Sequence, residues 1–149
     1  MNPQTIQIVP KRDDAPAVMP GLLAHLSDLD DDYMIADPIP DVRSWTVTLP
    51  DRRRVGRVDD VVLDTATMTA KYLEVKVDPE MLLGEQGRWV LLPVESVRLN
   101  ADEARIVIDH LPAGGLADAP HNNRELPTDA QQRAILAYFD ITTIGEPRG

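Results

Sequence analysis

The middle of the chain contains short runs in which apolar, often β-branched residues alternate with polar ones. Runs of this length and period, separated by turn residues, predict β-strands in a small antiparallel sheet or barrel. The predicted strands are Trp45–Leu49, Val55–Leu63, Tyr72–Val77, Trp89–Val94, Val97–Leu99 and Arg105–Leu111. In the third run, the alternation puts Leu73, Val75 and Val77 on one face and Tyr72, Glu74 and Lys76 on the other.

The period changes after the last strand. Pro127-Thr128-Asp129-Ala130-Gln131 is typical of a helix start, with Thr128 as N-cap and Gln131 three residues later, which together predict a capping box. The helix is expected to continue to about Phe139, and Ile135, Tyr138 and Phe139 form its apolar stripe. The fold predicted is mainly β, with a C-terminal helix.

Residues 1–42 form a different region, an extended acidic leader. Thr5–Val9 alternates and fits either an edge strand or a loose terminus, and Val18–Leu29 has leucines at helical spacing and predicts a short helix. The leader has too few apolar residues for a core of its own, so we expect it to be ordered mainly on a partner or on the sheet. The expected organisation is leader 1–42, barrel 43–111, and loop plus helix 112–149.

Composition narrows the classes of function. The net charge of -10 disfavours nucleic-acid binding, and the absence of cysteine excludes disulfides and thiolate chemistry. The chain shows neither a signal-peptide pattern nor an apolar run long enough to span a bilayer, for which roughly 18 residues are needed. We therefore expect a soluble cytoplasmic protein that reaches the inner membrane only through partners.

Candidate chemistry is sparse. The acidic run Asp28–Asp32 lacks the glycine and closing glutamate of a calcium loop, which favours a solvated loop over a metal site. His110 and His121 are interpreted as a strand-end residue and a loop residue, and His25 stands apart from both. No nucleotide-binding loop or nucleophile motif is present, so we predict no enzymatic activity, no metal and no directly bound cofactor.

Two features are candidate partner-binding sites. The basic cluster Arg52, Arg53, Arg54 and Arg57 is either a solvated turn or a docking patch for an acidic or phosphate-bearing surface. Met81, Leu82 and Leu83 lie in the long connection Asp78–Arg88, where they either fold back onto the body or form an exposed interface.

Three segments carry a resemblance to a known family. Arg53–Asp64 resembles the opening of a PRC-barrel domain, a turn followed by Gly-x-Val-x-Asp and a strand ending in Asp. Lys71–Val75 is similar to the second signature of that family, and Leu91–Val97 to the third. The resemblance covers residues 43–111 and implies a small PRC-type β-barrel.

The segment after the barrel is similar to the cytoplasmic domain of the H subunit of photosynthetic reaction centres. That resemblance implies a non-catalytic subunit that caps a membrane photosynthetic complex and assists proton delivery to the secondary quinone. Quinone and bacteriochlorophyll would then be bound only by partner subunits, either reaction-centre subunits or a separate anchor chain. Glu74 matches the glutamate that lies near the quinone site in H subunits, so it is the proton-transfer candidate.

Other interpretations of Glu74 and of the whole chain stay open. Glu74 fits equally an exposed ion pair with Lys76, which contributes little to stability. The chain departs from H subunits because it lacks their membrane-spanning helix and the histidines that mark proton entry. The alternative function is therefore a stand-alone homo-oligomeric PRC-barrel scaffold or stress-related protein, while ribosome assembly is disfavoured by the acidic charge.

Overall fold

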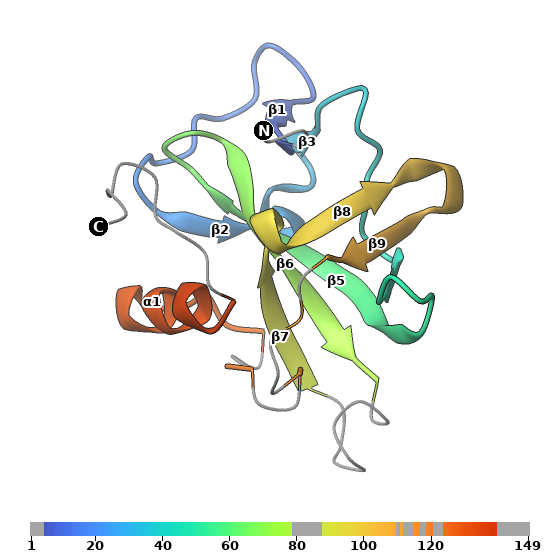
Figure 1. Cartoon of the computed structure of the whole chain (residues 1–149). Coiled ribbons are helices and arrows are strands. Elements are labelled where there is room, and N and C mark those ends of the chain that lie inside the picture. Colours follow the sequence, from blue (N-terminus) through green and yellow to red (C-terminus); the bar gives the residue numbers. More distant parts are fainter. Residues whose placement is uncertain are drawn as a thin grey trace, which may run out of the picture.

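The computed structural model describes residues 5–78, 88–109, 111, 115–116, 119–120 and 124–139 of the 149-residue chain. It is mainly β, with a curled, half-barrel sheet and one C-terminal α-helix (Figure 1). The strands are β1 Ile8–Pro10, β2 Leu23–His25, β3 Tyr33–Ile35, β4 Thr46–Thr48, β5 Arg54–Asp64, β6 Thr69–Val77, β7 Arg88–Pro93, β8 Val97–Asn100 and β9 Arg105–Ile108. The helices are η1 Leu26–Leu29, η3 Val94–Ser96, η4 Ala101–Glu103 and α1 Asp129–Tyr138.

The long strands β5 and β6 are the centre of the main sheet. The strand order is β7-β6-β5-β4-β9-β8, and β2 adds to β5 beyond the short strand β4. Gly56 allows β5 and β6 to approach closely, because a Cβ atom there would lie 2.4 Å from the carbonyl oxygen of Lys76. The prediction of a purely antiparallel sheet is wrong at one place, since β4 and β9 pair in parallel. The chain between these two strands forms β5, β6, β7 and β8 of the same sheet, which brings β9 back beside β4.

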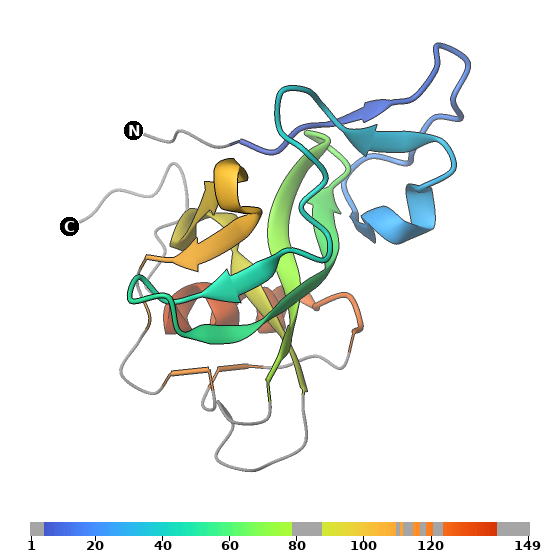
Figure 2. The same cartoon turned by 90° about the vertical axis from the view of Figure 1, so that its right-hand side faces the viewer.

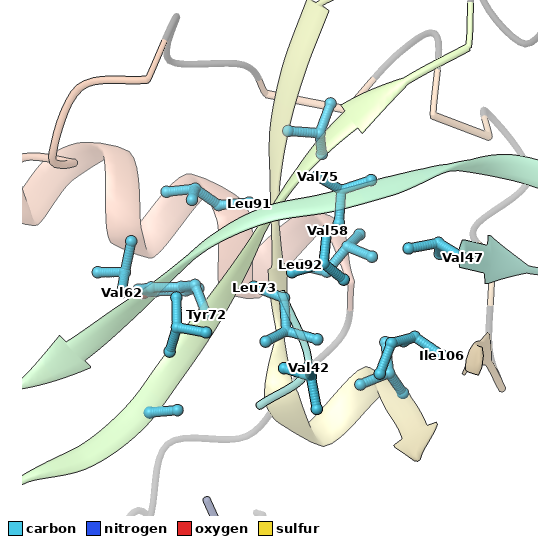
Figure 3. Close-up of a cluster of buried hydrophobic side chains, with 14 of the residues drawn as sticks. Val42, Val47, Val58, Val62, Tyr72, Leu73, Val75, Leu91, Leu92 and Ile106 are labelled. Atoms are coloured by element: carbon cyan, nitrogen blue, oxygen red, sulfur yellow. The ribbon is translucent and has the colours of Figure 1, made fainter. Parts of the chain in front are cut away.

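The core lies inside the curl of the sheet and is filled by aliphatic side chains. Figure 3 shows side chains from β4, β5, β6, β7 and β9 directed toward one another. The fully buried members include Val58, Leu73, Leu92 and Ile106. Only 4% of the residues are aromatic, so valine and leucine supply most of this packing. Burial of one such side chain stabilises the fold by about 1.5–3 kcal/mol.

The leader is part of the same core. Its buried side chains belong to one hydrophobic cluster with those of the sheet, and they are Ile6, Ile8, Leu26, Tyr33, Ile35 and Val42. The edge strand predicted over Thr5–Val9 is found in part, as β1 at Ile8–Pro10, which pairs with β3. The leader (blue) covers one end of the sheet, and α1 (red) lies toward the other (Figure 2). Within residues 5–42 the leader is therefore ordered on the sheet of its own chain.

The predicted helix over Val18–Leu29 is wrong. Leu23–His25 forms strand β2 against β5, and only Leu26–Leu29 turns, as a 3-10 helix. The leucine spacing fits a helix, but Thr65 donates its backbone N–H to the carbonyl of Leu22, and its hydroxyl accepts the N–H of Leu22 at 2.9 Å. Pairing with an already formed strand edge therefore prevails over a weak local helix preference.

Helix α1 confirms the prediction made from its cap. Thr128 and Gln131 form the capping box, and Ile135 and Phe139 are buried. The helix packs against β7, and the hydroxyl of Tyr72 on β6 donates to Gln132 Oε1 at 3.0 Å. The helix and the leader thus cover a face of β6 that alternation alone assigns to solvent.

Candidate functional site

Three side chains that can accept protons or bind metals meet between the leader and the sheet. His25 ends β2, Asp60 lies in β5 and Glu74 lies in β6. Asp60 is directly opposite Glu74 in the antiparallel register, and His25 is opposite Val62, two residues further along β5. Side chains two apart on a strand share a face, so the register brings all three together. One ligand atom from each lies within 4.8 Å of the other two. We call these residues the His25–Asp60–Glu74 cluster.

Glu74 is the most deeply buried charged residue of the cluster. Its side chain is 2% exposed, and its Oε2 accepts a hydrogen bond from Nε2 of His25 at 3.2 Å. Among the described residues, His25 is the only side chain that donates a hydrogen bond to Glu74. One carboxylate oxygen thus has no donor in the part of the chain that the structure describes. Carboxylates so deeply buried normally have paired charges and several donors.

Asp60 is held rigidly. Its Oδ1 accepts the backbone N–H groups of Val61 at 2.8 Å and Ser27 at 3.2 Å, and its Oδ2 accepts the hydroxyl of Ser27 at 2.5 Å. A register shift between Val58 and Asp60 makes Asp59 the extra residue of a bulge. Asp59 accepts from Trp89 Nε1 at 3.0 Å, while Asp60 is buried beneath the leader. The bulge therefore gives two adjacent aspartates different environments.

The cluster carries more negative than positive charge. Hydrogen bonding to Glu74 raises the pKa of His25 above its ordinary value, with added attraction from Asp60 and Asp28 and opposition from burial. In the described parts of the chain, no lysine or arginine forms an ion pair with Asp60 or Glu74. A single imidazolium can neutralise only one of the two carboxylates. Like charges on directly opposite residues of two strands are destabilising.

The expectation that Glu74 is exposed beside Lys76 is wrong. Glu74 is buried because β2 and η1 cover its face of the sheet, whereas Lys76 is exposed and lies over the ring of Trp89, 5.5 Å from its centroid. Trp89 itself is half-buried in β7. A glutamate in this position contacts its own leader, so it is not available on the surface for a neighbouring subunit.

The basic cluster is largely neutralised inside the chain. Arg52 pairs with Glu103 at 3.2 Å, Arg53 with Asp51 at 3.2 Å and Arg54 with Asp78 at 2.9 Å. Arg57 is also exposed, on β5. These contacts favour the solvated turn over a docking patch for acidic surfaces. The other predicted interface, Met81, Leu82 and Leu83, lies outside the described residues, as do His110 and His121.

Four acidic residues of the leader are paired with arginines: Asp14, Asp30, Asp32 and Asp41. Asp32 binds Arg12 at 2.6 Å, and Asp30 binds Arg43 at 2.9 Å. Arg43 also binds Asp41, whose pKa is lowered mainly by that hydrogen bond. The loop is largely solvent-accessible, and Asp30 and Asp32 are already paired with arginines of this chain.

A shallow hollow of about 300 Å³ lies where the leader approaches α1. Its lining is mixed, with apolar Leu22, Leu23 and Pro127 beside polar residues that include Asp64, Lys71, Asp129 and Gln132. Three of the large apolar side chains that remain exposed are Leu22 itself, Leu126 beside Pro127, and Met19, whose carbonyl accepts the same Thr65 hydroxyl as that of Leu22. Large apolar side chains that stay exposed are candidate contacts for a partner. We call Met19, Leu22 and Leu126 the apolar rim.

Sequence reasoning missed the His25–Asp60–Glu74 cluster because its members are far apart in the chain. The one available signal was the pair Asp59-Asp60, which interrupts an otherwise apolar strand. Two acidic residues there predict a bulge, but not which of them points inward. The position of His25 depended on β2, which was predicted as helix.

No helix in the described part of the chain has the length and apolar character needed to cross a membrane. Comparison with known proteins finds neither a family model nor a curated protein that matches this sequence.

Proposed function

We propose that this protein is a non-catalytic subunit that docks on the cytoplasmic face of a membrane redox complex, as its resemblance to reaction-centre H subunits implies. The observation that carries the proposal is the placement of the three signature segments. Arg53–Asp64 lies on β5, Lys71–Val75 on β6, and Leu91–Val97 on β7, η3 and the start of β8. Segments that resemble one family thus occupy adjoining parts of one curled sheet, which supports a PRC-type barrel.

The docking surface in this proposal is the apolar rim. Met19 is 70% exposed, Leu22 53% and Leu126 40%. Leu22 lines the hollow between the leader and α1, and Leu126 precedes Pro127, another lining residue. Burying such side chains against a partner would contribute about 25 cal/mol for each Å² removed from water. The arginines of the β4–β5 turn contribute less, because acidic neighbours in the same chain already pair with them.

Glu74 is not part of the proposed function. A carboxylate that is 1% exposed and bonded to the leader cannot be presented to a neighbouring quinone site without unfolding the leader. In this proposal the docked chain as a whole, and no single carboxylate, assists proton delivery. Quinone and bacteriochlorophyll remain ligands of the partner subunits in this proposal.

The test is reconstitution with reaction-centre core complexes from which the H subunit has been removed. We expect the chain to co-sediment with the cores and to speed the second, proton-coupled reduction of the secondary quinone after a flash. Leu22→Ser and Met19→Ser should weaken binding at least tenfold, or about 1.4 kcal/mol. Met34→Ser is the matched control, because Met34 is 38% exposed but lies on the separate β1–β3 sheet.

The same experiment distinguishes the alternative function. Absence of binding to the cores would contradict the proposal. If the chain instead sediments alone as an oligomer that Leu22→Ser dissociates, the apolar rim is a contact between copies. That result would favour the stand-alone scaffold.

A further inference from the structure

We infer that His25, Asp60 and Glu74 form a binding site for a divalent transition-metal ion, of which Zn²⁺ is the best fit. The site would clamp the leader to the sheet, because His25 comes from β2 and the two carboxylates from β5 and β6. This metal site does not depend on docking to a membrane complex, because all three ligands belong to this chain.

The first argument is ligand geometry. Zinc accepts imidazole nitrogen and carboxylate oxygen at about 2.0–2.2 Å in tetrahedral sites, which places neighbouring ligand atoms roughly 3.4 Å apart. His25 Nε2 and Glu74 Oε2 already lie 3.2 Å apart, and all three ligand atoms are within 4.8 Å of one another. A closer approach of at most about 1.4 Å between the ligand atoms would complete a three-ligand site. A water molecule would take the fourth position.

The second argument is charge. Two buried carboxylates face one imidazole, and no lysine or arginine of the described residues pairs with them. With His25 neutral, the cluster carries two negative charges, which one divalent cation balances. An imidazolium leaves one charge uncompensated. Buried charges without a counter-charge are costly, so the metal-bound form satisfies the site better than the ion pair alone.

The third argument is the support around the ligands. Asp60 is oriented by the N–H and hydroxyl of Ser27 and by the N–H of Val61. Glu74, whose side chain is 2% exposed, holds Oε2 against His25 Nε2 at 3.2 Å. Metal ligands are typically fixed by outer hydrogen bonds of this kind. His25 is 13% exposed at its side chain, so a metal ion can reach the cluster from the side of β2.

The ligand set selects among metals. Calcium takes six to eight oxygen ligands and magnesium keeps an octahedral shell of oxygens, so neither suits one nitrogen and two carboxylates under a covering strand. Imidazole favours zinc and its neighbours in the transition series. The acidic run Asp28–Asp32 is not a competing site of this kind, because two of its aspartates are paired with Arg12 and Arg43.

The test uses untagged, full-length protein freed of metal with a chelator and then titrated with ZnCl₂ by calorimetry. We expect one zinc ion per chain, a higher melting temperature, and slower proteolysis of the leader. Glu74→Gln, Asp60→Asn and His25→Gln should each weaken zinc binding at least tenfold. Asp32→Asn is the control and should bind zinc like the wild type, because Asp32 is paired with Arg12 in the acidic loop. Excess Mg²⁺ or Ca²⁺ should not displace zinc.

A second measurement keeps the inference testable even if a variant fails to fold. Co²⁺ bound to the wild-type protein should give the intense visible absorption of a four-coordinate ion. Weak absorption typical of six-coordinate Co²⁺, or no saturable zinc binding by the wild type, would overturn the inference. Zinc binding that survives in folded Glu74→Gln and Asp60→Asn, or that is lost in Asp32→Asn, would do the same.

Discussion

The chain has two groups of acidic residues, and their environments are opposite. The acidic loop Asp28–Asp32 is dense in the sequence, yet Asp30 and Asp32 are paired with arginines at the surface. Asp60 and Glu74 are 14 positions apart, yet they lie opposite each other on neighbouring strands, buried and without an arginine or lysine among the described residues. Charge density along a chain is therefore a poor guide to where uncompensated charge is found.

The difference between the two groups arises from the leader. Its loop supplies Asp30 and Asp32 together with Arg12, and the nearby Arg43 completes their pairing. Its strand β2 and helix η1 cover Asp60 and Glu74 and exclude water from them. Surface ion pairs contribute about 0–1 kcal/mol, whereas buried carboxylates depend on each hydrogen bond they accept. Substitutions in the two groups should therefore have unequal effects.

The largest loss of stability is expected when the packing of β2 and η1 over the buried carboxylates is weakened. Leu26→Ala should lower the free energy of unfolding by about 2–5 kcal/mol, because Leu26 is fully buried and anchors η1 to the core. Urea unfolding followed by circular dichroism measures this, and proteolysis within residues 11–24 should accelerate. Leu22→Ala is the control: Leu22 is 53% exposed, and its truncation should cost about 0.5 kcal/mol or less. A cost below about 1 kcal/mol for Leu26→Ala would mean that the leader is not packed as described.

A smaller loss of stability is expected when Asp60, one of the two buried acidic residues, is replaced. Asp60→Ala, measured with a chelator present, should destabilise the protein by about 1–3 kcal/mol, because it removes the acceptor of the Ser27 and Val61 donors. Asp32→Ala, its counterpart in the acidic loop, should change stability by about 1 kcal/mol or less. Equal costs for the two substitutions would remove the distinction between the buried and the exposed group.

The smallest effect concerns acid sensitivity at the surface. Hydrogen bonding to Arg43 lowers the pKa of Asp41 in the folded protein below its ordinary value. A lowered folded pKa stabilises the protein above the unfolded pKa, and that stability is lost as the pH falls through the folded pKa. Asp41→Asn should therefore flatten the decline in stability below about pH 4. Because the Asp41 side chain is half exposed, the loss at neutral pH should stay under about 1 kcal/mol. Parallel stability-versus-pH curves for both proteins would contradict this assignment.

Elements whose signals come from residues close together in the chain could be predicted from the sequence. The alternation in Val55–Leu63 and in Trp45–Leu49 predicted β5 and β4, and Thr128 with Gln131 predicted the start of α1. These succeed because strand alternation and helix capping involve residues close together in the chain. The mainly β fold and the absence of a membrane-spanning helix among the described residues follow from the same kind of local pattern.

The burial of Glu74 and the conformation of the leader depend on packing between segments that are distant in the sequence. Alternation in β6 assigned Glu74 to the face opposite Leu73, and it could not show that β2 and η1 cover that face. The helical leucine spacing of the leader was overridden because the edge of β5 offers unpaired backbone groups to a strand. The His25–Asp60–Glu74 cluster depends on this pairing and on a bulge at Asp59, two long-range features of the sheet. Local sequence specifies which side a residue takes on its own strand, but only packing determines what covers that side.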